Sequence, residues 1–116
     1  MLIHGIGLPR QTWAGLLPAL TMHFRVLSYD LCGHGESALP IRMPSLTVLS
    51  DQLRDVMDHL NLPQAGLIGF SLGGMINRRF AMDHPDRVSA LVILNSPHER
   101  SPEAQQIGRA SCRERV

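Results

Sequence analysis

The sequence predicts an α/β fold in which a central parallel sheet has helices on both faces. Segments with strand character alternate with segments whose apolar residues recur at helical spacing, as βαβ units require. Uninterrupted apolar runs such as residues 91–94 fit strands that are covered on both sides. At one strand-to-helix junction, residues 69–73 read Gly-Phe-Ser-Leu-Gly, a pattern that places a serine on a tight turn.

The first elements lie before residue 30. Residues 1–3 have the apolar character of the end of a buried strand. Residues 12–20 carry apolar side chains at helical spacing, which predicts a helix there. Residues 24–29 form a second predicted strand, which ends before a glycine-containing turn.

A longer helix follows a proline-containing loop. Ser45 can cap its first turn, and Asn61-Leu62-Pro63 stops it. One face of this helix carries apolar residues at steps of three and four: Leu46, Leu49, Leu53, Val56 and Leu60. Three further elements are then predicted: a strand over residues 64–69, a helix over Leu72–Asp83 and a strand over Val88–Leu94.

The Gly-x-Ser-x-Gly pattern has the strand–turn–helix setting of a nucleophile elbow. Ser71 must then lie on a strained turn that exposes its hydroxyl, so we expect its φ to be positive or close to it. Gly69 and Gly73 are expected where strand and helix pass too close for a Cβ atom. The turn also points backbone N–H groups at the start of the following helix, where negative charge is favoured.

Two further motifs precede the elbow. His4-Gly5-Ile6-Gly7 follows the first apolar run, and residues 30–37 read Asp-Leu-Cys-Gly-His-Gly-Glu-Ser. With the elbow, and in this order, they resemble the α/β-hydrolase superfamily over about residues 1–99. The segments GFSLGGMI and HPDRVSALVILNS are most similar to its serine esterase and lactonase branch, including the 3-oxoadipate enol-lactonase-like hydrolases.

The resemblance implies a partial α/β-hydrolase fold. The strands would be the family's strands three to six, in the spatial order four, three, five, six. Family members are typically more than twice as long, so the sequence is interpreted as a truncated fragment. Ligands of such sheets bind beyond the carboxyl ends of the strands, where all three motif turns would lie.

The resemblance also implies a catalytic arrangement. Ser71 would be the nucleophile, and the backbone N–H groups of Leu72 and Ile6 would form the oxyanion hole. The family's acid and histidine follow the serine far downstream, at positions that we expect to lie outside this sequence. The 116-residue chain alone is therefore expected to hydrolyse esters feebly, if at all.

The histidines of the sequence are not expected to serve as the base. His4 and His34 are interpreted as structural or pocket-lining residues, and His23, His59 and His84 as helix-end residues. His98 has the wrong order relative to an acid. Three other residues stay open between a structural and a catalytic or reactive role: Asp30, Cys32 and Glu99.

The last ten residues differ in character from the rest. Residues 107–116 lack periodicity and resemble the forward translation of a common short-read sequencing adapter. We therefore predict a core domain over residues 1–106 and a non-native tail over residues 107–116 without regular structure. Leaving out the tail's three arginines and one glutamate changes the net charge from +1 to −1, which gives no reason to expect nucleic acid as a partner.

The predicted function is hydrolysis of a carboxylic ester or lactone through an acyl-enzyme on Ser71. The substrate would be a small molecule, with no cofactor, metal ion, nucleic acid or membrane involved. Cys32 is the one cysteine outside the tail and cannot form an internal disulfide, which fits a cytoplasmic location. The oligomeric state is left open.

Several alternatives keep the fold. Carbon–carbon bond hydrolases, thioesterases and cofactor-free haloperoxidases also use the serine. Epoxide hydrolases and haloalkane dehalogenases carry aspartate at the nucleophile position, and Ser71 argues against them. A non-catalytic member that binds a small ligand is the alternative from another functional class.

Overall fold

The computed structural model describes residues 1–5, 7–8, 10–34, 37 and 44–96. The elements run along the chain in the order β1 (Leu2–Ile3), η1 (Arg10–Trp13), α1 (Leu17–Thr21), α2 (Leu46–His59), β2 (Ala65–Phe70), α3 (Leu72–Asp83), η2 (Pro85–Arg87) and β3 (Val88–Leu94). Strands and helices alternate from β2 onward, which confirms the predicted α/β class.

The sheet is parallel, with β2 at its centre. β1 pairs with β2 in the register Leu2 to Ile68, and β2 pairs with β3 as far as Phe70 and Leu94. An isolated parallel bridge joins Ser28 to Leu2, which places residues 24–29 on the far side of β1. The predicted spatial order is therefore confirmed. The prediction of a full strand over residues 24–29 was wrong, because this segment pairs with β1 through that single bridge alone.

α2 begins and ends where the sequence predicts. The Ser45 hydroxyl accepts a hydrogen bond from the N–H of Val48 at 3.2 Å, and Asn61, just after the helix, has a positive φ of 55°. Its buried face is centred on Leu49, Leu53 and Met57. This face packs against α3, as the steps of three and four in the sequence require. Leu49 and Leu53 were predicted to lie on it, whereas Met57 is buried in place of Val56, which is half-buried.

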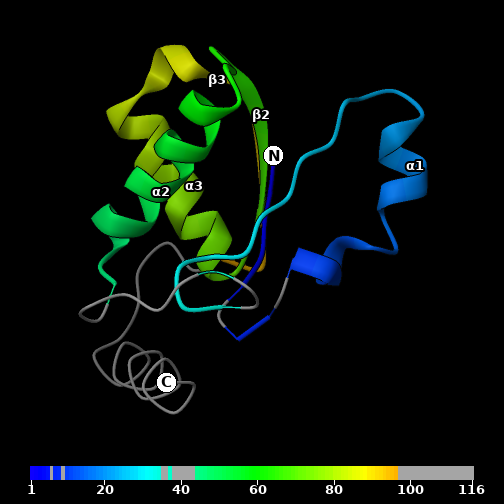
Figure 1. Cartoon of the computed structure of the whole chain (residues 1–116), viewed down its shortest axis with the longest axis horizontal. Coiled ribbons are helices and arrows are strands. Elements are labelled where there is room, and N and C mark those ends of the chain that lie inside the picture. Colours follow the sequence, from blue (N-terminus) through cyan, green and yellow to red (C-terminus); the bar gives the residue numbers. More distant parts are fainter. Residues whose placement is uncertain (6, 9, 35–36, 38–43, 97–116) are drawn as a thin grey trace.

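α2 and α3 cover one face of the sheet, as Figure 1 shows. The core lies between these helices and the strands and contains eight buried apolar residues: Ile3, Leu31, Leu49, Leu53, Met57, Leu67, Ile76 and Phe80. Burying a side chain of this size stabilises the fold by about 1.5–3 kcal/mol relative to leaving it exposed. The core thus fixes strands β1 and β2 and helix α3, and Ser71 joins β2 to α3.

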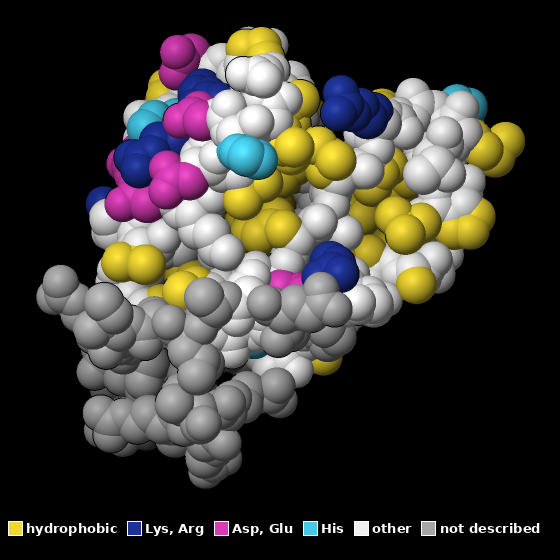
Figure 2. Space-filling view, in the orientation of Figure 1, with side chains coloured by type: hydrophobic (Ala, Val, Ile, Leu, Met, Phe, Trp, Pro, Cys, Tyr) yellow, Lys and Arg dark blue, Asp and Glu magenta, His cyan; other side chains and the backbone are white. Residues whose placement is uncertain are grey.

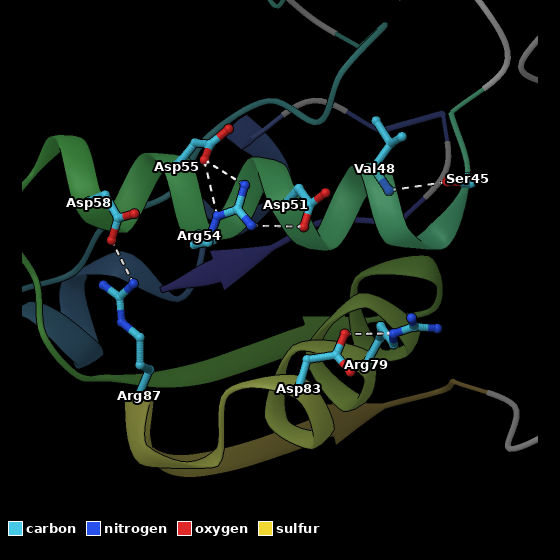
Figure 3. A network of polar contacts seen from close by, with 9 residues as sticks. All are labelled: Ser45, Val48, Asp51, Arg54, Asp55, Asp58, Arg79, Asp83 and Arg87. Carbon is cyan, nitrogen blue, oxygen red and sulfur yellow. Dashed lines mark hydrogen bonds and ion pairs between the residues drawn. The ribbon is translucent and has the colours of Figure 1, made fainter.

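The outer surfaces of these helices carry ion pairs (Figure 3). Arg54 pairs with Asp51 and Asp55 on α2, and Arg79 pairs with Asp83 on α3. Such exposed pairs contribute little to stability, because solvent and salt screen their charges. Arg87 also donates to the carbonyls of Leu62 and Pro63, so it ties the start of β3 to the segment that precedes β2.

α1 lies on the opposite side of the sheet from α2 and α3 (Figure 1). The prediction of one helix over residues 12–20 was wrong, because the structure has a short 3-10 helix, a turn and then α1. Pro18 explains the difference. It lacks an N–H group and is tolerated in the first turn of a helix, so α1 begins at Leu17.

The second face of the sheet is partly open. A hollow of about 520 Å³ lies between this face and the chain around α1, and Phe24, Leu27 and Val92 are among the residues that line it. Figure 2 shows hydrophobic side chains gathered between the two sides of the molecule. β3 was expected to be covered on both faces, but Leu91, Val92 and Leu94 are 39–44% exposed. Among the described residues, β3 is the edge strand and pairs with β2 alone.

The predicted tail, residues 107–116, lies outside the described residues, which end at Ser96. Among the helices that the structure describes, none combines the length and the apolar composition that a membrane span would need.

Candidate active site

Ser71 occupies the turn between the end of β2 and the start of α3. Its dihedral angles are φ 53° and ψ −113°, which confirms the predicted positive φ. A non-glycine residue held in such a backbone conformation costs about 1–3 kcal/mol, so the surrounding structure must enforce it. The N–H of Ser71 donates to the Leu94 carbonyl at 2.9 Å, and its carbonyl accepts from Gly74 at 3.0 Å. The end of β3 and the first turn of α3 thus hold the elbow from both sides.

The two elbow glycines lie where the backbone leaves no room for a side chain. A Cβ atom on Gly69 would be 2.4 Å from the carbonyl oxygen of Gly73. A Cβ atom on Gly73 would be 2.1 Å from the carbonyl oxygen of Ile3. Strand β2 and helix α3 therefore meet at backbone contact, as predicted. The contact of α3 with β1 was not predicted.

Sequence reasoning missed a third position of this kind. A Cβ atom on Gly74 would lie 2.5 Å from the Cβ of Ser96 and 2.9 Å from Ile93. This glycine lets α3 approach the end of β3. The doubled glycine at residues 73–74 was the signal in the sequence that could have revealed it.

The predicted oxyanion hole is described in part. Leu72 is the first residue of α3, so its N–H is among those that an α-helix leaves without an intrahelical acceptor. Ile6 lies outside the described residues. Its neighbour Gly5 is described, and a Cβ atom on Gly5 would be 3.3 Å from the Cβ of Ser71. Gly5 therefore lies beside the candidate nucleophile, and the roles of Leu72 and Ile6 stay predictions.

His4 is fully buried and is engaged through both ring nitrogens. Its Nε2 accepts the N–H of Leu31 at 2.9 Å, which leaves Nδ1 to donate to the Gly5 carbonyl at 2.8 Å. Burial is the main cause of a lowered pKa of His4, and the nearby ring of His34 lowers it further. His4 is therefore a neutral histidine occupied by the fold, in keeping with a structural role.

Asp30 is the centre of a polar network at the same edge of the sheet. Its side chain is 2% exposed, and its carboxylate accepts from both the backbone N–H and the guanidinium of Arg10. Its carbonyl accepts from the amide of Gln52 and from the Ser37 hydroxyl. These bonds support the turn-stabilising interpretation of Asp30. Neither Arg10 nor Gln52 was singled out from the sequence.

The remaining described histidines contact other groups or are exposed. His34 is buried, its Nδ1 bonds to the Cys32 carbonyl, and its ring lies 5.3 Å from that of His4. His23 and His59 are exposed, and the ring of His84 contacts Phe80. Within the described residues, the Ser71 hydroxyl has no hydrogen bond to a histidine or a carboxylate. His98 and Glu99 lie outside these residues.

Cys32 is half-buried rather than buried. Its backbone N–H donates to the side-chain oxygen of Gln52 at 2.9 Å, so α2 holds the main chain at this residue.

The chain belongs to the α/β-hydrolase fold family, which it matches over residues 1–112. The match runs past residue 106, the predicted boundary of the core domain. This family membership agrees with the parallel sheet and the helices that flank it.

Three relatives illustrate the range of the family. A putative carbamate hydrolase, RutD, of Caulobacter vibrioides is 37% identical over 107 residues, which cover 86% of this chain and 39% of that protein. A hydrolase from Pseudomonas aeruginosa PA01 has a TM-score of 0.89 and 36% identity, covering 99% of this chain and 43% of its own. The enol-lactonase from Burkholderia xenovorans LB400 has a TM-score of 0.80 and 34% identity, and the match covers 82% of this chain and 36% of the lactonase. The chain thus spans less than half the length of these relatives.

Proposed function

We propose that this chain is the nucleophile-bearing part of a longer serine hydrolase, called the whole protein below, which cleaves a carboxylic ester or lactone. The observation that carries the proposal is the backbone of Ser71, a non-glycine residue with a φ of 53° between glycines at backbone contact. Such strain at a partly exposed serine is the arrangement of a nucleophile elbow. The similarity to an enol-lactonase supports lactone cleavage as one form of this chemistry.

The proposed reaction has two steps. The Ser71 hydroxyl attacks the carbonyl carbon and gives its proton to a histidine base supplied by the whole protein. The C–O bond then breaks, and the leaving oxygen receives that proton, as an alcohol or as the opened end of a lactone. Water attacks the acyl-Ser71 ester in the second step, releasing the acid and restoring the serine. No step requires a metal ion or cofactor.

The N–H groups of Leu72 and Ile6 would bind the negative oxygen that forms during attack. Each such donor is worth about 3–4 kcal/mol in the transition state. The position of Leu72 at the start of a 12-residue helix adds a favourable dipole for that charge.

The same site is also compatible with other functions. A carbon–carbon bond hydrolase, a thioesterase or a cofactor-free haloperoxidase would use the serine on another substrate. A non-catalytic member would bind a small ligand without chemistry.

Hydrolysis of p-nitrophenyl acetate and of a small aliphatic lactone by the whole protein tests the proposal. We expect Ser71→Ala to reduce kcat by about 10⁴-fold or more, as loss of a nucleophile does. Ser89→Ala, on the exposed side of β3, is the matched control and should retain full activity. Equal activity of the Ser71→Ala variant and the parent would refute the proposal, and turnover of a thioester alone would favour a thioesterase.

A further inference from the structure

The two ends of the turn that follows β1 are attached to two adjacent residues of another turn. At its start, His4 accepts the N–H of Leu31 through Nε2 at 2.9 Å. At its end, Arg10 binds the carboxylate of Asp30 through its backbone N–H at 2.7 Å and through its guanidinium. His4 and Arg10, at the two ends of this segment, are therefore held by one anchor, the dipeptide Asp30-Leu31. The described residues of the segment, 4–5, 7–8 and 10, are called the loop below.

The ion pair between Arg10 and Asp30 fixes the position of Arg10 relative to the Asp30 carboxylate. The side chain of Asp30 is 2% exposed and that of Arg10 is 35% exposed, so the carboxylate is held in a largely dry environment. One carboxylate oxygen accepts the backbone N–H and the other the guanidinium. Two charge-assisted bonds on one carboxylate restrict its position and its orientation more than a single bond would.

The anchor itself is fixed to the core. The side-chain amide of Gln52, on α2, donates to the carbonyl of Asp30 at 3.1 Å and accepts from the N–H of Cys32 at 2.9 Å. α2 packs on α3, which begins at the elbow. Hydrogen bonds thus connect the loop to α2 through Asp30, and apolar packing connects α2 to α3, the helix that follows the candidate nucleophile.

The loop also lies directly against the elbow. A Cβ atom on Gly5 would be 3.2 Å from the ring of Phe70 and 3.3 Å from the Cβ of Ser71. A displacement of this backbone therefore changes the space on one side of the Ser71 side chain. Misplacement of a catalytic group by about 1 Å can cost about 100-fold in rate.

We propose that Arg10 and Asp30 are positioning residues, which hold the loop, and Gly5 in particular, at its working distance from Ser71. The inference rests on the proposed function. Among the described residues, no hydrogen bond or ion pair joins Arg10 or Asp30 to Ser71 or Leu72, so the pair acts through the backbone of the loop. Its loss reduces stabilisation of the transition state and leaves substrate binding largely unchanged.

The test is made on the whole protein with three variants. Arg10→Met removes the guanidinium, Arg10→Lys keeps the positive charge beside the buried carboxylate, and Asp30→Asn removes the negative charge. Arg79→Met breaks the exposed Arg79–Asp83 pair on α3 and is the matched control. For each we measure kcat and KM on p-nitrophenyl acetate, the second-order rate of fluorophosphonate labelling, and Tm.

We expect Arg10→Met and Asp30→Asn to reduce kcat by about 10- to 100-fold, with KM within about twofold of the parent. Fluorophosphonate labelling should slow by a similar factor. Arg10→Lys should recover part of the loss, and Arg79→Met should change neither constant. A folded Arg10→Met variant with the parent's kcat would overturn the inference, as would a rise in KM alone.

Two safeguards keep the outcome decisive. Where Arg10→Met does not fold, judged by Tm, Asp30→Asn is read by the same criterion, because it removes the ion pair and keeps the shape of the side chain. Ser71→Ala separates the two proposals. Activity that survives Ser71→Ala refutes the proposed function, whereas Ser71-dependent activity that is indifferent to both Arg10 variants refutes the positioning role alone.

Discussion

The carboxyl edge of the sheet and its open face are built in different ways. At the edge, glycines bring three backbones into contact and a polar network links the turns that follow β1 and precede α2. On the open face, Val92 is 44% exposed and Phe24 is 65% exposed beside a hollow of about 520 Å³. The difference teaches that contacts within this chain are sufficient to define the elbow, whereas they leave much of the second face of the sheet accessible.

The largest effect is expected where a backbone contact is broken. Gly73→Ala places a Cβ atom 2.1 Å from the Ile3 carbonyl oxygen, which neither β1 nor α3 can relieve without separating. We expect the free energy of unfolding of the whole protein to fall by about 4 kcal/mol or more, measured by urea unfolding. Gly15→Ala is the matched control, because a Cβ atom there meets nothing within 4 Å. Equal stability of the two variants would contradict the account of the elbow.

The next largest effect contrasts the two faces of the sheet. Leu67 on β2 is 1% exposed and belongs to the core, so Leu67→Ala should cost about 3 kcal/mol. Val92→Ala, on the open face, should cost well under about 1 kcal/mol, because much of that side chain already contacts solvent. The same urea unfolding measurement compares them. A cost at Val92 as large as that at Leu67 would mean that the open face is covered in the whole protein.

A smaller effect is expected at Gln52. Gln52→Leu leaves the N–H of Cys32 without its acceptor and removes one donor from the Asp30 carbonyl, a loss of about 1–3 kcal/mol. Gln64→Leu removes an exposed bond to the Asp86 carbonyl and serves as the control, with little effect expected. Thermal unfolding followed by circular dichroism would show whether the two variants differ. Identical Tm values would mean that Gln52 does not secure the Asp30 turn.

The smallest effect concerns pH. The pKa of His4 in the folded state lies below its ordinary value of 6.5, chiefly because the ring is buried. The unfolded state then binds a proton before the folded state does, so stability is full above that value and is lost as the pH falls below it. The contribution is at most about 1.4 kcal/mol per pH unit. His4→Gln should flatten this part of the profile and the exposed His23→Gln should not. A parent profile that is flat from pH 7 to pH 5 would contradict the prediction.

The elbow was predictable because its constraints are local. A serine between glycines at the junction of a strand and a helix requires the positive φ that Ser71 has. The order of the strands also followed from sequence resemblance. The break before α1 was missed because helical spacing outweighed Pro18, although the residue itself signalled it.

Long-range contacts could not be predicted in the same way. Arg10 meets Asp30 across 20 residues, and Gln52 meets it across 22, and neither residue stands in a recognisable motif. The exposure of β3 was missed because an apolar run shows what a strand can bury rather than what covers it.

The central claim is that Ser71 is the nucleophile, and covalent labelling tests it most directly. The whole protein is treated with a fluorophosphonate probe, digested, and mapped by mass spectrometry. We predict one added group on the peptide that contains Ser71, none in the Ser71→Ala variant, and full labelling in Ser89→Ala. Absence of labelling at Ser71 in active protein, or labelling that persists on another residue after Ser71→Ala, would contradict the claim.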